Sequence, residues 1–217
     1  MRSRSSEKWP SWTLAIAKGR LFDPTVAFLK KLNMLPAHFA DMGRHLSIDV
    51  PEQGLKILLL RAFDVPTYVE YGAADLGIVG SDLLMEQMKE VYEPLDLRFG
   101  QCRMVLAEPC RPSRAQPHRK RRVATKYPNV TERYFCERGL PVEMIKLYGS
   151  IELAPLLGLS DQIVDLSSTG ETLSAHGLTV IDTLAVCSAR LIVNRASLKL
   201  KHPFLQTQIH RIRDGIA

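Results

Sequence analysis

Short apolar segments rich in β-forming residues alternate along this chain with segments of helical spacing. A strand is predicted at 13–17 and a helix over 21–35, and the same succession returns with a strand at 75–80 and a helix at 81–88. Apolar strands separated by helices are typical of a mainly parallel sheet whose two faces are both covered. The pattern therefore predicts an α/β fold.

This alternation occurs twice. One βα pattern runs from 13 to about 90, a second begins near 122, and two longer predicted strands, 92–100 and 102–109, lie between them. We predict two α/β lobes around a central cleft, with the type II architecture of periplasmic binding proteins, and a cleft of this kind is a common place for a ligand. The expected boundaries are a disordered basic tail at 1–12, lobe I at 13–101 plus 191–217, and lobe II at 102–190.

Composition narrows the class of protein. No apolar run among the 217 residues approaches the roughly 20 that a membrane-spanning helix needs, and no apolar signal core follows the basic N-terminus. A cytoplasmic protein that does not enter a membrane is therefore expected. The four cysteines, Cys102, Cys110, Cys136 and Cys187, lie far apart without a CxxC pair. They are expected to be free thiols, most of them in the core, and not ligands of zinc.

The formal net charge of +6 favours anionic partners. Much of the excess lies in 111–122, which carries six cations and no acid. A solvated surface loop, an RNA contact and a basic rim on a phosphate site are all compatible with this segment. No aromatic residues interleave with the charges, so a stacking platform for single-stranded nucleic acid is poorly supported.

Two predicted turns between a strand and a helix have residues suited to an anion. Ligands of α/β sheets bind where strands end and helices begin, because the first turn of a helix exposes backbone N–H groups. "AKGRL" places Lys18, Gly19 and Arg20 in such a turn. "GIVGSDLL" places Gly80 and Ser81 in another, with Asp82 as a candidate cap. Each turn alone is also compatible with an ordinary solvated connection.

A third turn follows the predicted strand "QIVDL" at 162–166. Ser168, Thr169, Gly170 and Thr172 would surround one anion with hydroxyl and N–H groups. Asp165 ends the strand, and because a carboxylate repels phosphate it needs another partner, such as a ribose diol. The turn therefore indicates a ribose 5-phosphate, although a Ser/Thr-rich helix cap remains the alternative.

At this point the sequence resembles a known family. "ELAPLLGLSDQIVDLSSTGETL", from Glu152 onward, is similar to the signature of ATP phosphoribosyltransferase. "DVPTYVEYGAADLGIVGSDLL" at 64–84 and "AKGRL" match two further blocks, so that the resemblance extends over roughly 13–217. The chain is similar to the short form, which lacks the C-terminal regulatory domain of the long form.

The resemblance implies the reaction that begins histidine biosynthesis. Adenine N1 of ATP attacks C1 of phosphoribosyl pyrophosphate, and N1-(5-phosphoribosyl)-ATP and pyrophosphate form. Family members use Mg²⁺, which is expected to arrive on the substrate's pyrophosphate and not on protein ligands. The short form implies a regulatory subunit related to histidyl-tRNA synthetase, in a hetero-oligomer that also contains a homodimer of this chain. Nucleic acid is not an expected partner.

The family's functional residues transfer by motif. Phosphoribosyl pyrophosphate is expected at Glu152, Asp165, Ser168, Thr169, Gly170, Glu171 and Thr172. Catalytic contacts to the phosphates are expected from Lys18, Arg44 and Arg61, since the arginine fork binds phosphate oxygens in pairs. The nucleotide is expected at Gly19, Arg20, Gly80, Ser81 and Tyr127. Replacing Gly170 with valine is then expected to weaken binding of phosphoribosyl pyrophosphate and to leave the fold intact.

Two other classes of function are weaker. Two α/β lobes with crossing strands also describe solute-binding proteins, which bind an anion without reacting it and usually carry an export signal. An RNA-binding protein that uses Arg119–Arg122 would need a recognition motif, and none is present in the sequence.

Overall fold

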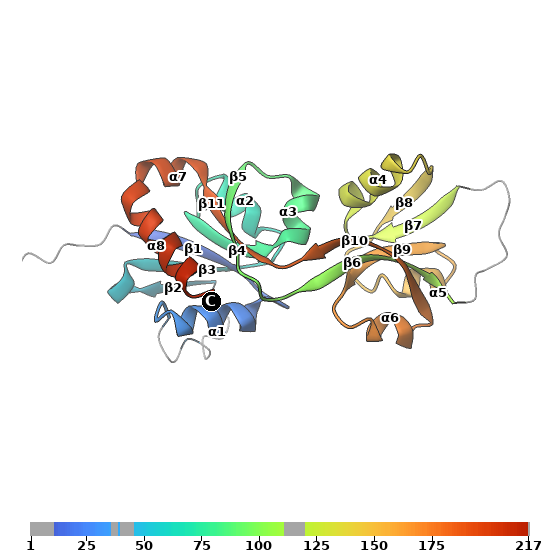
Figure 1. The fold of residues 1–217 in the computed structure, drawn as a ribbon, viewed down its shortest axis with the longest axis horizontal. Helices are drawn as coiled ribbons and strands as arrows, with labels where there is room; N and C mark the ends of the chain where they lie inside the picture. Colours follow the sequence, from blue (N-terminus) through green and yellow to red (C-terminus); the bar gives the residue numbers. More distant parts are fainter. Residues whose placement is uncertain (1–10, 36–38, 40–45, 111–119, 217) are drawn as a thin grey trace, which may run out of the picture. The chain divides into compact units, whose positions relative to one another are not determined.

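The computed structural model describes residues 11–35, 39, 46–110 and 120–216. They divide into two compact units, each built around its own sheet (Figure 1). Unit 1 consists of Met1–Leu84, Met88–Gly100 and Ala189–Ala217, and unit 2 consists of Met85–Gln87 and Gln101–Ser188. The chain is thus an α/β protein with two sheets, as the sequence predicts.

Unit 1 contains a six-stranded sheet in the order β2-β3-β1-β4-β11-β5. Strand β1 pairs in parallel with β3 on one side and with β4 on the other. Strands β2, β11 and β5 join antiparallel. The strands are β1 (Trp12–Ala17), β2 (Ser47–Val50), β3 (Leu55–Leu60), β4 (Leu76–Gly80), β5 (Val91–Asp96) and β11 (Ala189–Asn194). The short 3-10 helix η2 (Pro51–Gln53) closes the β2–β3 hairpin.

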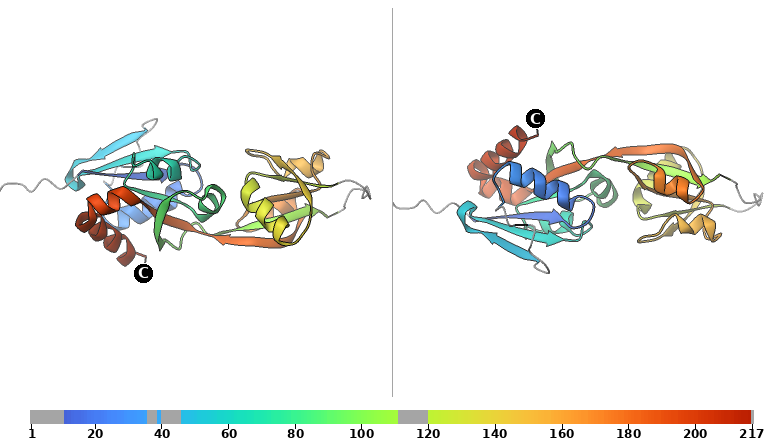
Figure 2. Two further views of the ribbon diagram at one scale, coloured as in Figure 1. Left: turned by 90° about the horizontal axis from the view of Figure 1, so that it is seen from above. Right: turned by 90° about the horizontal axis from the view of Figure 1, so that it is seen from below.

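Helices cover both faces of the unit 1 sheet. Helices α1 (Phe22–Lys31) and α8 (His202–Asp214) lie side by side on one face, where Leu29 and Ile209 enter the main core (Figure 2). Helix α2 (Val65–Glu70) packs against β4 and β11. The remaining helices with residues in this unit are α3 (Ser81–Gln87) and α7 (Arg195–Leu200). Apolar residues from α1, α8 and the sheet therefore form one continuous core.

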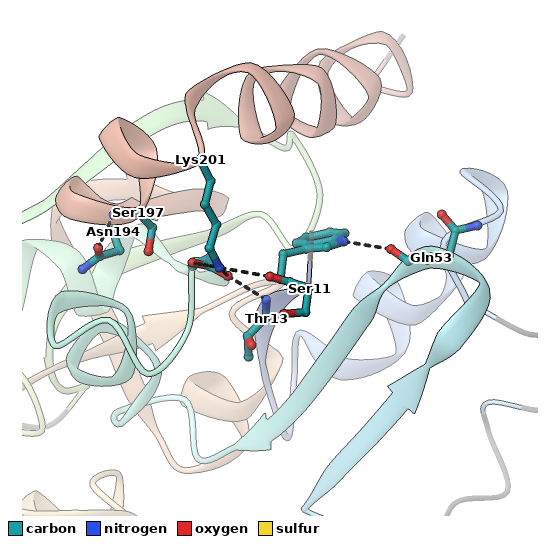
Figure 3. A network of polar contacts seen from close by, with 8 residues as sticks. Ser11, Thr13, Gln53, Asn194, Ser197 and Lys201 are labelled. Atoms are coloured by element: carbon teal, nitrogen blue, oxygen red, sulfur yellow. Dashed lines mark hydrogen bonds and ion pairs between the residues drawn. The ribbon is translucent and has the colours of Figure 1, made fainter. Parts of the chain in front are cut away.

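A buried carboxylate ties the C-terminal helices of unit 1 to its sheet. Lys201, between α7 and α8, contacts both oxygens of Asp75 at 3.0 and 2.9 Å and also donates to the carbonyl of Ser11 (Figure 3). Asp75 is only 5% exposed and accepts a further hydrogen bond from the backbone N–H of Thr13. The charge is therefore fully engaged at the amino ends of β1 and β4.

Unit 2 contains a five-stranded sheet in the order β10-β6-β9-β7-β8. Strand β7 runs parallel to β8 and β9, whereas β6 and β10 are antiparallel. The strands are β6 (Cys102–Pro109), β7 (Arg121–Thr125), β8 (Val142–Lys146), β9 (Gln162–Ser167) and β10 (Leu178–Cys187). Both long strands, β6 and β10, begin or end beside the boundary with unit 1.

Three helices of unit 2 connect its strands. They are α4 (Pro128–Glu137), α5 (Leu153–Leu156) and α6 (Glu171–Ala175). Phe135 and Thr131 of α4 are buried, and Ala154 of α5 and Leu173 of α6 belong to a second apolar cluster with β6, β7 and β9. The sheet is thus covered on the faces that its alternating apolar residues create.

Several expectations need correction. The sheets are mixed and not mainly parallel, because the β2–β3 hairpin and the long strands run antiparallel to their neighbours. Asp64, which the sequence suggests as the N-cap of a helix that begins at 65, precedes α2, but its side chain accepts no capping hydrogen bond. All four cysteines are free, and two of them, Cys110 and Cys136, are exposed instead of buried. None of the described helices is long and apolar enough to cross a membrane.

Candidate functional site

The carboxyl edge of the unit 1 sheet gathers most of the residues predicted to bind the nucleotide. Strands β3, β1 and β4 are parallel neighbours, so the residues that follow them emerge at one edge. Register places Ala17 opposite Leu60, and the backbone N–H of Lys18 donates to the carbonyl of Leu60 at 2.8 Å. Lys18 and Arg61 therefore leave adjacent strands side by side.

The turn after β1 has a left-handed glycine. Gly19 has φ of +90°, and no described atom lies within 4 Å of the position that a Cβ would occupy. Its carbonyl accepts from the N–H of Phe22, which begins α1. Arg20 is exposed and donates to the carbonyl of Gly100 at 2.7 Å. The turn thus combines an accessible backbone with cationic side chains, which suits a phosphate.

The turn after β4 is buried, unlike the turn after β1. Ser81 is 8% exposed, and a Cβ on Gly80 would collide with Oδ1 of Asp82. The nearest atoms belong to the Asp82 side chain, which folds over Gly80. Gly80 and Ser81 therefore lie at the predicted edge, but they are much less accessible than Lys18, Gly19, Arg20 and Arg61.

The carboxyl edge of the unit 2 sheet brings together the predicted phosphoribosyl residues. Strands β9, β7 and β8 are parallel neighbours, with Thr125 opposite both Val164 and Lys146. The Thr125 hydroxyl donates to the carbonyl of Val164 at 2.8 Å and holds the strands together at this end. The segment 168–172 follows β9, and Glu152 precedes α5 in the connection after β8.

The segment 168–172, here called the hydroxyl loop, has an open geometry. Ser168, Thr169 and Thr172 are exposed, and Gly170 has φ of +85° with no described atom within 4 Å of a Cβ position. The Thr169 hydroxyl accepts from the N–H of Glu171 at 3.4 Å, and the Gly170 carbonyl accepts from the N–H of Ser174. Hydroxyl and backbone groups therefore surround a space that solvent can reach.

The first turn of α4, at the same edge, already holds an anion of the protein itself. The carboxylate of Glu86 accepts from the N–H groups of Asn129 and Val130 at 3.1 and 3.0 Å. The Asn129 side chain donates to the carbonyl of Glu86 in return. Tyr127, just before this helix, is only 3% exposed. A substrate phosphate therefore has better access to the hydroxyl loop than to α4.

Acidic side chains also lie on the elements that end at this edge. Asp165 is half-buried on β9 and accepts from the N–H of Leu166 at 2.8 Å. Glu152 is half-buried immediately before α5, and Glu171 is exposed on the first turn of α6. Throughout the described residues, no three His, Cys, Asp or Glu side chains gather into a metal site. The carboxylates are separate groups and do not form a metal cluster.

Other residues of the signature lie at the opposite edge of the unit 2 sheet. Gly158 has φ of +70° and ends α5, with its N–H donating to Pro155 and that of Leu159 donating to Ala154, the two hydrogen bonds of a Schellman cap. Asp161 accepts from the N–H of Arg122 at 2.8 Å, at the start of β7. The signature therefore contains residues that shape the fold as well as residues of the candidate site.

Sequence reasoning left out two cations at the carboxyl edge of unit 2. Lys126 follows Thr125 directly, and Arg103 of β6 is opposite Ser167, the last residue of β9. Strand register across the sheet identifies Arg103, and that information is absent from local sequence pattern, whereas Lys126 is placed by its position after β7. Among the predicted residues, Arg44 lies outside the described part of the chain, as does 111–119 of the basic segment.

Comparison with known proteins gives a consistent result. Residues 61–216 match the family model described as ATP phosphoribosyltransferase. An ATP phosphoribosyltransferase of Geobacter metallireducens is 56% identical over 194 residues, covering 88% of this chain and 92% of the relative. One of Pseudomonas fluorescens Pf-5 is 45% identical and covers 94% and 96%. These relatives have nearly the length of this chain, as the short form requires.

Solved structures extend the comparison to the fold. A chain of the ATP phosphoribosyl transferase (HisG:HisZ) complex of Thermotoga maritima superposes with a TM-score of 0.81 at 35% identity, covering 94% of this chain and 97% of that one. The aliphatic sulphonate-binding protein SsuA of Escherichia coli superposes at 0.60 with 13% identity, over 96% of this chain and 73% of that one. The second likeness shows the fold alone and confirms the periplasmic-binding-protein-like architecture.

Proposed function

The chain belongs to the ATP phosphoribosyltransferase family, and we propose that the carboxyl edges of its two sheets divide the recognition of the substrates. The family reaction condenses ATP with phosphoribosyl pyrophosphate and is the first step of histidine biosynthesis. We assign the phosphoribosyl group to unit 2 and the phosphates of the nucleotide to unit 1. Each assignment rests on the side chains and backbone groups of that edge.

The hydroxyl loop carries the proposal. A phosphate needs several donors that converge on a small space, and Ser168, Thr169 and Thr172 supply exposed hydroxyls around the left-handed Gly170. The open position beside Gly170 lets an anion approach the backbone N–H groups closely. Because Glu86 already occupies the first turn of α4, the hydroxyl loop is the best place at this edge for the 5-phosphate.

The carboxylates suit the ribose. Asp165 lies on β9 two residues before the strand ends at Ser167, so a sugar attached to a phosphate at the hydroxyl loop would lie within its reach. An ionised carboxylate accepts hydrogen bonds from two vicinal hydroxyls, and such charge-assisted bonds are about twice as strong as neutral ones. Glu152, in the connection from β8 to α5, is assigned to the same sugar on the family resemblance.

The unit 1 edge suits polyphosphate. Lys18, Arg20 and Arg61 are exposed there, and the backbone of Gly19 is accessible. We assign Lys18 and Arg61, with Arg44, to the phosphates. Gly19 and Arg20 are placed beside the nucleotide. Gly80, Ser81 and Tyr127 are assigned to the nucleotide on the family resemblance, and as buried residues they would shape its pocket more than contact solvent.

The chemistry requires placement and charge more than proton transfer. The adenine N1 attacks with its own lone pair, so no strong general base is needed. As the bond to pyrophosphate breaks, positive charge grows on the sugar and negative charge on the leaving group. Carboxylates near the ribose and cations near the phosphates would stabilise these charges. Mg²⁺ prefers oxygen ligands, and the pyrophosphate supplies them, so we propose that the ion enters with the substrate.

The family likeness also suggests partners. Since a similar chain is found in a HisG:HisZ complex, we propose that this chain assembles with a regulatory subunit related to histidyl-tRNA synthetase, through a homodimer of its own. Histidine would then control the reaction through that subunit. Both substrates are metabolites of the cytoplasm, so the enzyme is expected to work there.

The reaction is tested by the absorbance of phosphoribosyl-ATP. The purified chain is mixed with ATP, phosphoribosyl pyrophosphate and Mg²⁺, with pyrophosphatase to remove one product. We expect product that depends on both substrates. Calorimetry with phosphoribosyl pyrophosphate alone separates two failures. Binding without turnover would point to the absent regulatory subunit, whereas a chain that binds neither substrate would contradict the proposal.

A further inference from the structure

We infer that Arg103 is a further substrate-binding residue, which contacts the 5-phosphate of phosphoribosyl pyrophosphate beside the hydroxyl loop. The inference rests on the proposed function of that loop. Arg103 belongs to β6, far from the signature in sequence, and neither composition nor motif singles it out. Its position in the sheet carries the argument.

Strand register places Arg103 at the entrance to the hydroxyl loop. Strands β6 and β9 are antiparallel, and Arg103 is directly opposite Ser167, after which the loop begins. Directly opposite residues of an antiparallel pair have Cβ atoms about 4.5–5.5 Å apart and lie on the same face of the sheet. An arginine side chain starting there is long enough to reach a phosphate held by the next few residues.

The face of the sheet is also correct. Val105 and Ala107 alternate with Arg103 along β6, and both belong to the apolar cluster that contains Leu173 of α6. Side chains of alternating residues share one face, so Arg103 lies on the side that α6 covers. The hydroxyl loop leads from β9 into α6 and therefore lies at the end of that same face.

The acidic side chains near the hydroxyl loop explain why a cation would be needed there. Asp165 shares this face, since it is opposite Val105, and Glu171 follows the loop. Both acids repel a phosphate dianion, so a nearby cation is needed to offset them. The Arg103 side chain is exposed, and with the side chains and backbone of the described residues its guanidinium forms no hydrogen bond, ion pair or ring contact. Its five donors are thus available for a ligand, and its fork matches two phosphate oxygens.

The test measures ligand affinity by calorimetry in the full-length Arg103→Gln chain. The probes are phosphoribosyl pyrophosphate, ribose 5-phosphate and inorganic pyrophosphate. We expect the first two to bind about ten- to hundredfold more weakly, the range for a charge-assisted hydrogen bond, and the third to be unchanged. Arg103→Lys should restore part of the affinity, because the charge remains and the fork is lost. Arg121→Gln, an exposed arginine at the opposite edge of the sheet, is the matched control.

The outcomes separate the inference from the function beneath it. Wild-type affinity of Arg103→Gln for ribose 5-phosphate, or a loss confined to pyrophosphate, would overturn the assignment to the 5-phosphate. If Thr169→Ala lost affinity in the same assay while Arg103→Gln did not, the phosphate role of the hydroxyl loop would be supported and the role of Arg103 would be contradicted. If the wild-type chain itself failed to bind phosphoribosyl pyrophosphate, the proposed function of the hydroxyl loop and the role of Arg103 would both be contradicted. Unchanged melting temperatures of the variants would exclude unfolding as the cause of any loss.

Discussion

The two sheets present different chemistry at the same topological position. At the carboxyl edge of unit 1, the exposed side chains Lys18, Arg20 and Arg61 are all cations. At the carboxyl edge of unit 2, hydroxyls are flanked by the carboxylates of Asp165 and Glu152. A cationic edge suits a chain of phosphates, and a mixed edge suits a phosphate joined to a diol. In the proposed assignment, the sheet topology places both ligand positions at carboxyl edges, and the side chains distinguish which part of the ligand each edge would take.

The backbone of the two edges is more alike than the side chains. Gly19 and Gly170 both adopt left-handed conformations, with φ of +90° and +85°, shortly before a helix. In both turns the carbonyl of the glycine accepts a hydrogen bond from the helix that follows. In both, the position of a Cβ is open to at least 4 Å among the described atoms. The same turn can thus serve two different ligand groups.

The largest loss of kcat/KM is expected when Asp165, one of the carboxylates that distinguish the unit 2 edge, is replaced. Asp165→Asn removes the charge that would bind two ribose hydroxyls, while the amide oxygen can still accept from Leu166. Hydrogen bonds to a charged group contribute about 1.5–3 kcal/mol each, so kcat/KM for phosphoribosyl pyrophosphate should fall about a hundredfold or more.

Steady-state kinetics with varied phosphoribosyl pyrophosphate check this result. Asp161→Asn, at the other end of the same strand, is the control and should alter stability more than kcat/KM, because Asp161 binds the backbone of Arg122. If the two variants behaved alike, the contrast between the edges of this sheet would be wrong.

A smaller effect is expected at the cationic edge of unit 1. Arg61→Gln removes one of several cations, so the remaining ones still attract the phosphates. We expect the KM for ATP to rise about tenfold and to depend less on salt than in the wild type. Lys56→Gln provides the control, since Lys56 is exposed on β3 and faces Asp49 at 3.7 Å. An equal change in both variants would indicate general attraction by net charge instead of a site.

Local sequence pattern predicted the parts of the site that lie in single turns. A strand followed by hydroxyls, a glycine and a helix is visible in "DLSSTGETL", and the structure has β9, the hydroxyl loop and α6 in that order. The pattern could not reveal Arg103, because its place beside Ser167 depends on which strand neighbours β9 and in what register. Pairing between distant strands is a property of the whole sheet.

Two helices differ from the sequence prediction, and each difference has a local physical cause. The segment "SIELAPLLGL" at 150–159 has a helical pattern in the sequence, but the helix is only Leu153–Leu156, because Gly158 takes a left-handed cap. Helix α7 was not predicted. The sequence signal for it is Asn194, because asparagine favours the N-cap position. In the structure its side chain accepts a hydrogen bond from the N–H of Ser197 at 2.7 Å. A helix this short has too few residues to show helical periodicity.

The two left-handed turns should respond alike in stability. Gly170→Ala and Gly19→Ala each place a Cβ in open space, so the cost is the left-handed conformation alone, about 1–2 kcal/mol. Asparagine at either position should cost less, because it tolerates this conformation better. Valine at position 170 would be strained in this conformation, so this substitution is expected to cost stability as well as affinity.

Chemical denaturation of the two alanine and two asparagine variants measures these costs. The alanine variants should differ from each other by less than either differs from the wild type. The Gly170→Asn chain should still lose affinity for phosphoribosyl pyrophosphate, whereas the Gly19→Asn chain should lose affinity mainly for ATP. If both asparagine variants lost affinity for the same ligand, the assignment of different ligand groups to the two edges would be contradicted.

The smallest effect is expected away from both edges, where α4 contacts β10. The Tyr134 hydroxyl donates a hydrogen bond to Asp182. The Arg138 guanidinium carbon lies 3.7 Å from the centre of the Tyr134 ring, and its Nη2 lies 3.5 Å from the Asp182 carboxylate. The hydrogen bond from Tyr134 is the main reason that the pKa of Asp182 is lowered. Burial, followed by this hydrogen bond, raises the pKa of Tyr134, so the phenol stays neutral at neutral pH.

Tyr134→Phe should lower the melting temperature slightly at pH 7 and leave the affinity for both substrates unchanged. Because the pKa of Asp182 is lower in the folded chain, its interaction stabilises the fold above the ordinary value of 3.8 and is lost as the pH falls through the folded value. The difference in melting temperature between wild type and Tyr134→Phe should therefore shrink below about pH 4. A difference that stayed constant down to about pH 2 would mean that Tyr134 acts through packing and not through the charge of Asp182.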